Sequence, residues 1–110
     1  MRTLRFIVDG QLIKQDPNCD FSGLVPGSNG YLKASFKFSS DWANMAKVAS
    51  FFSPLGKEYS PQLLDGYYSC LIPAEALARR MFKVQVIGKD ANGKKLTTNK
   101  LEVTQNGGTV

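Results

Sequence analysis

The sequence predicts an all-β protein, an antiparallel β-sandwich of about seven or eight short strands. Three observations lead to this expectation. Apolar and polar residues alternate with a period of two along most of the chain, which is typical of half-buried strands. Turn-forming pairs such as Asp65-Gly66 separate these runs at intervals of roughly 8–12 residues, as in sandwiches and barrels. The 110 residues, 43% of them hydrophobic, suffice for one core, so we expect one domain over 1–104 and a flexible tail over 105–110.

The first half of the chain predicts a hairpin followed by one long strand. A strand over 4–8 leads through Asp9-Gly10, a pair that favours the positive φ angles of tight hairpins, into a return strand over 11–14. A polar loop over 16–29 follows. The clearest alternation lies over 31–38, where we expect four apolar side chains to face the core, namely Leu32, Ala34, Phe36 and Phe38.

The second half predicts further strands and one short helical segment. Pro61 lacks an N–H group and should confine its strand to a sheet edge. Good helix formers follow Pro73, so we expect a helical turn near 73–79. The expected strands are 47–52, 58–64, 67–72, 81–88 and 96–104, with Phe82, Val84 and Val86 facing inward on the fourth of them.

The residue inventory argues against an enzyme. The sequence has no histidine, which removes the commonest general base and every Ser-His-Asp or Cys-His arrangement. Neither a calcium loop of alternating acids nor a glycine-rich phosphate loop is present. Most of the nine acids lie in predicted turns, where they favour local hydrogen bonds. We therefore expect no catalytic residues, no cofactor and no metal site.

The cysteines and the N-terminus suggest folding in a reducing cytoplasm. Cys70 lies in an apolar strand and reads as a buried free thiol, whereas Cys19 lies in a polar loop. A disulfide between them is the alternative for an oxidised sample. Charges at Arg5 and Asp9 interrupt the first apolar stretch, so no export signal is expected. No run of about 20 apolar residues predicts a membrane span.

The net charge of +5 is concentrated late in the chain. Such an excess can mark a surface for nucleic acid or for an acidic partner, and the alternative is an ordinary solvated strand face and hairpin tip. The sequence carries no DNA- or RNA-binding motif, so nucleic acid is not the expected partner. The candidate basic surface consists of Arg79, Arg80, Lys83, Lys94 and Lys95.

Aromatic residues supply the candidate interface. Trp42, the only tryptophan, could stack on a sugar or a partner, but a tryptophan beside a strand end more often fills a sandwich core. Phe51 and Phe52 should lie on opposite faces of one strand, which would expose one of them. Exposed aromatic side chains near one another favour an interface. The candidate residues are Trp42, Phe52, Tyr59, Tyr67 and Tyr68.

An ordered set of short motifs resembles a known module across about residues 4 to 104. It begins with the strand and turn ending at Asp9-Gly10 and continues with an alternating strand that leads to Asp41-Trp42. The segments Lys47–Phe52 and Cys70–Leu77 follow, and Phe82–Gly88 and Thr97-Thr98-Asn99 complete the set. The set resembles the immunoglobulin-like module of tail, baseplate and fibre structural proteins of bacteriophages and prophages.

The resemblance implies an immunoglobulin-like sandwich that serves as a virion structural protein of tail, baseplate or head. It implies other virion proteins as partners, self-association in the particle, a location in the virion after synthesis in the bacterial host cytoplasm, and no catalytic residues. Members often continue into a fibre, whereas this sequence ends at Val110, which favours a decorating or joining piece or a domain of a longer protein. The alternatives are an adhesion module for a host glycan or receptor, and a phage-encoded regulator that binds a host protein or nucleic acid.

Overall fold

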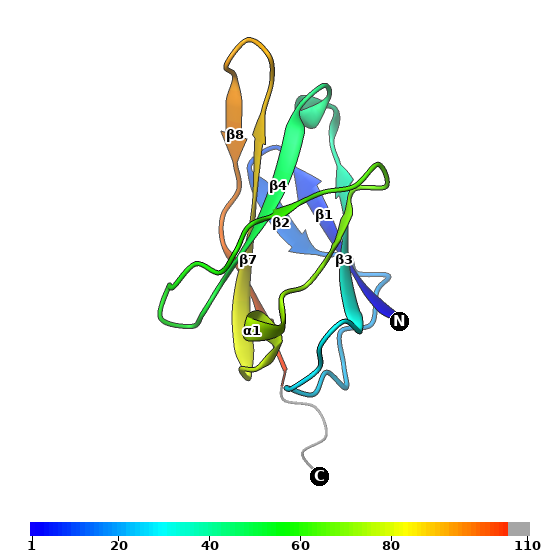
Figure 1. The fold of residues 1–110 in the computed structure, drawn as a ribbon. Coiled ribbons are helices and arrows are strands. Elements are labelled where there is room, and N and C mark those ends of the chain that lie inside the picture. Colours follow the sequence, from blue (N-terminus) through cyan, green and yellow to red (C-terminus); the bar gives the residue numbers. More distant parts are fainter. Residues whose placement is uncertain (106–110) are drawn as a thin grey trace.

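The computed structural model describes residues 1–105 and contains two packed β-sheets, which confirms the predicted all-β sandwich (Figure 1). The first sheet has the strand order β2-β1-β3-β6, with β1 at Arg2–Asp9, β2 at Leu12–Gln15, β3 at Leu32–Phe38 and β6 at Ser69–Leu71. The second sheet has the order β5-β4-β7-β8, and β9 also pairs with β7. Its strands are β4 at Ala46–Phe52, β5 at Gln62–Leu63, β7 at Met81–Lys89, β8 at Lys95–Thr97 and β9 at Leu101–Thr104.

One pairing contradicts the expectation of an antiparallel sandwich, because β1 and β3 run parallel from Arg2 opposite Leu32 to Val8 opposite Phe38. Parallel neighbours need a long crossover, and β2 with the loop after it returns the chain to the start of β1. The Arg2 guanidinium holds that loop by donating to the carbonyl oxygens of Asp20 and Ser22, at 2.9 and 2.6 Å. The period of two is the same for both strand directions, so the sequence pattern could not distinguish them.

The core lies between the sheets and follows the predicted alternation. On β3, Ala34 and Phe36 are buried as expected, and on β7 the inward phase of Phe82, Val84 and Val86 is confirmed. Phe6 of β1 stacks on Phe36 with ring centroids 5.3 Å apart, so the parallel pair contributes one aromatic layer of the core. Such burial is the dominant stabilising contribution in a domain of this size.

The short elements differ from the prediction in extent. The expected helical turn is α1 at Ala74–Leu77, and a 3₁₀ turn, η1, covers Ser40–Trp42. The strand expected over 58–64 is reduced to β5, with one separate bridge between Phe52 and Glu58. Pro61 stands between the two pieces and has no N–H group with which to continue the ladder.

The turn between β5 and β6 is wider than the expected Asp65-Gly66 pair. The Asp65 carboxylate accepts hydrogen bonds from the backbone N–H groups of Tyr67 and Ser69, at 2.8 and 3.0 Å. This local pairing keeps Tyr67 and Tyr68 out of the strand, so β6 is shorter than the predicted 67–72. Tyr68, rather than a glycine, adopts a left-handed conformation there, with φ of 59°.

Gln105 was predicted to begin the flexible tail but is fully buried. Its side-chain Nε2 donates to the carbonyl oxygens of Leu77 and Arg79, at 3.1 and 2.8 Å, which ties the end of β9 to the segment after α1. Residue 105 therefore belongs to the folded domain. The rest of the predicted tail, 106–110, lies outside the described residues.

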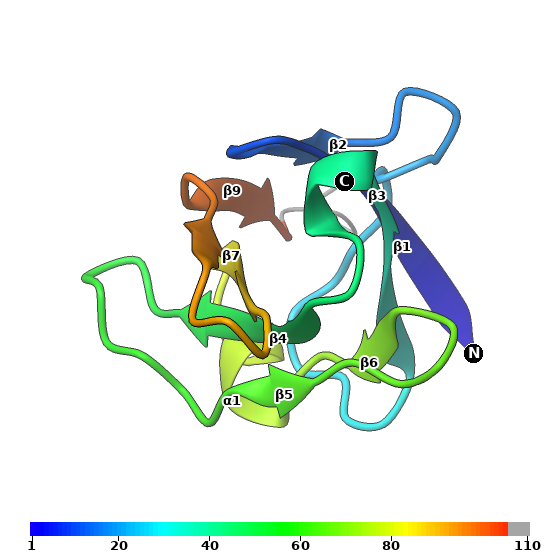
Figure 2. The same cartoon turned by 90° about the horizontal axis from the view of Figure 1, so that it is seen from above.

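One side of the sandwich is closed by side chains, and we call it the closed seam, consisting of β2 and Thr97–Asn99. The Asn99 carboxamide Oδ1 accepts from the Ile13 N–H at 2.8 Å, and its Nδ2 donates to the Ile13 carbonyl at 3.4 Å. The Thr98 hydroxyl accepts from the Val86 N–H at 3.0 Å. The amide of Asn99 thus takes the place of a neighbouring strand along β2. Figure 2 shows β2 on the side of β9, and β5 and β6 on the other side.

Candidate functional site

Two of the five candidate interface residues are buried. Trp42 is 0% exposed, and its indole Nε1 donates to the carbonyl oxygen of Gly10 at 2.8 Å. Its ring lies directly over Gly88, where a Cβ atom would come within 2.7 Å of it. Trp42 therefore fills the core, and its ring is not free to stack on a sugar or a partner.

The expectation that Phe51 or Phe52 is exposed is wrong, because both are buried. Phe51 points into the core, whereas Phe52 on the opposite face of β4 is covered by the Lys100 side chain, whose Nζ lies 4.1 Å from the ring centroid. The aliphatic stem of a lysine often shields apolar surface in this way. Phe52 is therefore not a contact residue of the isolated domain.

The three tyrosines do not form one surface. Tyr59 follows the bridge to Phe52, is partly buried and packs against the core. Tyr67 and Tyr68 lie together in the turn between β5 and β6, with 85% and 45% of their surface exposed. Of the five candidates, only Tyr67 and Tyr68 in this turn are exposed to solvent.

The five candidate basic residues are separated into two groups. Arg79, Arg80 and Lys83 lie between α1 and the start of β7, whereas Lys94 and Lys95 lie at the hairpin between β7 and β8 (Figure 1). Lys95 lies opposite Lys89, six positions along β7 from Lys83, so the two groups are roughly 20 Å apart at their nearest. The expected single basic surface is therefore not formed by these residues.

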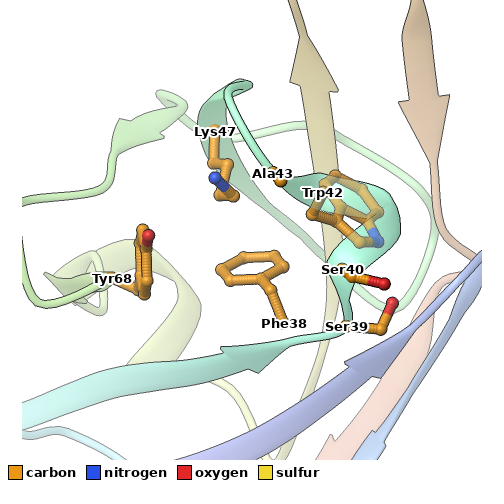
Figure 3. Close-up of a pocket in the computed structure, with 7 residues that line it drawn as sticks. All are labelled: Phe38, Ser39, Ser40, Trp42, Ala43, Lys47 and Tyr68. Carbon is orange, nitrogen blue, oxygen red and sulfur yellow. The ribbon is translucent and has the colours of Figure 1, made fainter.

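A pocket lies where β3 ends, η1 follows and β4 begins (Figure 3). Its volume is about 200 Å³, and it is lined by Phe38, Ser39, Ser40, Trp42, Ala43, Lys47 and Tyr68. The Phe38 ring forms its floor, with a centroid 5.3 Å from Trp42 and 5.4 Å from Tyr68. We call this the aromatic pocket.

Lys47 supplies the charge in the aromatic pocket. Ala49 and Phe51 face the core, so the alternation of β4 turns Lys47 inward too, and only 8% of this residue is exposed. Its ammonium Nζ donates to the Met45 carbonyl at 2.9 Å and lies 5.2 Å from the Phe38 ring centroid and 4.8 Å from that of Tyr68. Cation–π attraction of this kind contributes about 1–2 kcal/mol when partly desolvated.

Burial lowers the pKa of the Lys47 ammonium below its ordinary value, and among residues 1–105 no carboxylate counteracts the shift. The charged form is disfavoured because the group has lost part of its hydration. The aromatic pocket therefore holds a cation with incomplete solvation and no anionic partner.

A second pocket of about 250 Å³ adjoins the first and shares Lys47 and Tyr68 with it. Leu63 on its rim is 72% exposed, and the Asp65 carboxylate is engaged by the turn's N–H groups. The two pockets lie on the side where the edge strands β5 and β6 meet. We call this the open seam, and its residues are Phe38, Lys47, Leu63, Leu64, Tyr67 and Tyr68.

The sequence reasoning missed Lys47 and Phe38 as site residues. Both were assigned to strands, and neither was considered for binding. The sequence nevertheless carries a signal for Lys47. Side chains alternate along a strand, so Lys47 shares the core face with Ala49 and Phe51, which lie two and four positions further on. A lysine at a core-facing position is uncommon and marks either a buried cation or a strand end.

Three further features concern the metal-binding side chains, the cysteines and the helices of residues 1–105. Among residues 1–105 no three His, Cys, Asp or Glu side chains gather as a metal site would require. Cys19 and Cys70 are both free thiols. No helix in the same range is long and apolar enough to cross a membrane. No family model, no curated protein and no solved structure matches this chain.

Proposed function

We propose that this chain is a non-enzymatic assembly module that docks through its open seam and serves as a structural protein of bacteriophage particles. One observation supports this choice of docking surface. Leu63 of β5 and, on the turn held by the Asp65 carboxylate, Tyr67 and Tyr68 expose 72%, 85% and 45% of their surface beside two pockets. Exposed aromatic and apolar side chains on a rigid support are typical of protein interfaces.

The bacteriophage context rests on the sequence resemblance. The motifs of that resemblance include the Asp41-Trp42 pair and Thr98-Asn99, which occupy supporting positions in this fold. Asn99 joins β2 to the second sheet, and the Trp42 ring packs on Gly88 of β7, which leaves the open seam available for a partner. Virion proteins act in many copies, and repetition strengthens contacts that are individually weak. The proposed partners are other virion proteins and further copies of this chain.

Quantitative mass spectrometry of gradient-purified particles tests this function. Particles should come from a culture whose genome encodes the chain. We expect the chain at a fixed copy number per particle, and that number should match the symmetry of its attachment site. Absence from the particles, with the chain present in the same lysate, would contradict the virion role.

Binding of a host glycan is a second candidate, and the exposure of Tyr67 favours it. Sugars stack on exposed aromatic faces, and Tyr67 and Tyr68 are adjacent. The Tyr68 ring is 5.4 Å from Phe38, which in turn contacts Trp42, so binding there should change Trp42 fluorescence. Titration with a panel of host surface glycans should leave the fluorescence unchanged if the assembly function is correct, and a saturable change would favour adhesion.

A further inference from the structure

The Lys47 ammonium has more hydrogen-bonding capacity than the protein uses. An ammonium group has three N–H donors. One donates to the Met45 carbonyl, and the rings of Phe38 and Tyr68 offer electrostatic attraction without a lone pair as acceptor. In Figure 3 the Nζ atom points from β4 into the space between these two rings. The unused donors therefore face the aromatic pocket.

A methionine would fill the same position without a charge. Burying an ammonium without an anion has an energetic cost, because the lost hydration is not replaced in full. The chain nevertheless places a lysine there, with only 8% of the residue exposed to solvent. A bound anion would supply the missing partner, and the ammonium would attract it more strongly than a fully hydrated lysine would, because the site is poorly hydrated.

The two pockets that meet at Lys47 differ in their suitability for an anion. The second pocket includes Asp65, whose carboxylate would repel a negative group. The aromatic pocket includes no acidic side chain among its lining residues. An anion would thus approach Lys47 across Phe38, Ala43 and Tyr68.

We propose that the aromatic pocket binds a carboxylate, and that an aspartate or glutamate side chain of the protein docked on the open seam supplies it. This source rests on the proposed assembly function. One ammonium in a pocket of about 200 Å³ matches one singly charged group of small size. A phosphate would bring a greater charge and usually requires arginine or several N–H donors. The exposed Leu63 and Tyr67 beside the pocket fit the apolar surroundings of a protein side chain.

The carboxylate site can be tested on the purified chain alone. Acetate is the probe and neutral acetamide is its matched control, titrated at constant ionic strength while NMR follows the Lys47 ε-methylene and the Tyr68 ring. We expect saturable shifts with acetate, with a dissociation constant on the order of tens of millimolar, and none with acetamide. Equal responses to both probes, or no saturation with acetate, would overturn the site.

Two variants assign the response to Lys47. Lys47→Met should keep the fold and abolish the acetate response. Lys57→Met, at an exposed lysine in the loop after β4, should leave the response unchanged. A persistent response in folded Lys47→Met would overturn the assignment, and thermal melting of both variants verifies the fold.

A third comparison identifies the source of the carboxylate and separates it from the function. Glucuronate that binds about tenfold more tightly than acetate would indicate an acidic sugar and overturn the protein source. In particles, Lys47→Met should be incorporated less than Lys57→Met. Equal incorporation of the two variants would overturn the protein source while leaving the acetate result intact. Absence of the unaltered chain from particles would instead contradict the virion function.

Discussion

The closed seam and the open seam end the same sandwich in opposite ways. At the closed seam, the carboxamide of Asn99 pairs with both backbone groups of Ile13, and the Trp42 indole reaches Gly10. At the open seam, β5 has only two residues, and Lys47 turns an ammonium toward a pocket. An unpaired strand edge invites association unless it is covered. In the proposed function, the closed seam provides stability and the open seam provides the contact with a partner.

The largest expected effect is at Trp42. Trp42→Ala should destabilise the fold by about 3–5 kcal/mol, because it empties a large buried site and removes the hydrogen bond to Gly10. Chemical denaturation measures this loss. Tyr67→Ala, on the exposed turn, is the matched aromatic truncation and should change stability by no more than about 0.5 kcal/mol. Similar losses for both variants would remove the distinction between the two sides.

A smaller effect is expected from adding one methyl group at Gly88. A Cβ there would lie 2.7 and 2.8 Å from two carbon atoms of the Trp42 ring, so Gly88→Ala should destabilise by about 1–3 kcal/mol. Gly66→Ala, in the turn of the open seam, meets nothing within 4 Å and should be nearly neutral. Thermal melting compares the two, and a neutral Gly88→Ala would show that the Trp42 ring is packed loosely.

Alkaline pH should test the edge strand β6 through Cys70. Burial, aided by the nearby Asp65 charge, raises the pKa of this thiol from 9.0 to about 12. Between these values the unfolded chain loses the proton and the folded chain keeps it. Stability from this group is therefore complete below pH 9.0 and falls by about 1.4 kcal/mol per pH unit toward pH 12.

Denaturation at several pH values measures the fall through two variants. Cys70→Ala should lack this component, whereas Cys19→Ala, which retains Cys70, should show it. Apart from Cys19, every other ionisable side chain is common to both variants and cancels in the comparison. Parallel curves for the two variants would mean that water reaches the Cys70 thiol.

The hydrogen-bonded pair at the closed seam should contribute about 1 kcal/mol. Asn99→Ala leaves the N–H and the carbonyl of Ile13 without the carboxamide, and a typical net hydrogen bond contributes this amount. Asn18→Ala, an asparagine of an exposed loop whose backbone N–H rather than its side chain is bonded, is the control. Denaturation that finds both variants equal to the unaltered chain would show that water substitutes for Asn99.

Much of the fold was within reach of the sequence, because the period of two places Phe36 and Val84 inward and Asp9-Gly10 at a hairpin. The direction of β3 was not, since alternation is the same in parallel and antiparallel pairs. Tyr68 lies outside its predicted strand, in a turn where the Asp65 carboxylate accepts hydrogen bonds from the N–H groups of Tyr67 and Ser69. Local hydrogen bonds of this kind compete with strand pairing in ways that a residue pattern does not encode.

The candidate site was harder to predict than the fold. Trp42 and Phe52 drew attention as large aromatic residues, yet one is packed over Gly88 and the other is covered by Lys100. For Lys47, the one signal in the sequence is the alternation of its strand, which directs the side chain toward the core. Its surroundings come from β3, β4 and the turn after β5, which are distant in sequence, so only the assembled sandwich reveals the pocket.

Incorporation of an open-seam variant and a closed-seam variant into phage particles tests the central claim most directly. Leu63→Ser with Tyr67→Ser removes apolar surface from the open seam, and Leu12→Ser removes it from β2 on the closed seam, where that side chain is 52% exposed. Each should alter stability by no more than about 0.5 kcal/mol per exposed position. We predict that quantitative mass spectrometry finds the open-seam variant depleted by about tenfold or more, as expected for a loss of about 1.4 kcal/mol in binding, with Leu12→Ser at the normal copy number. Equal incorporation of the two, or selective loss of Leu12→Ser, would contradict the account.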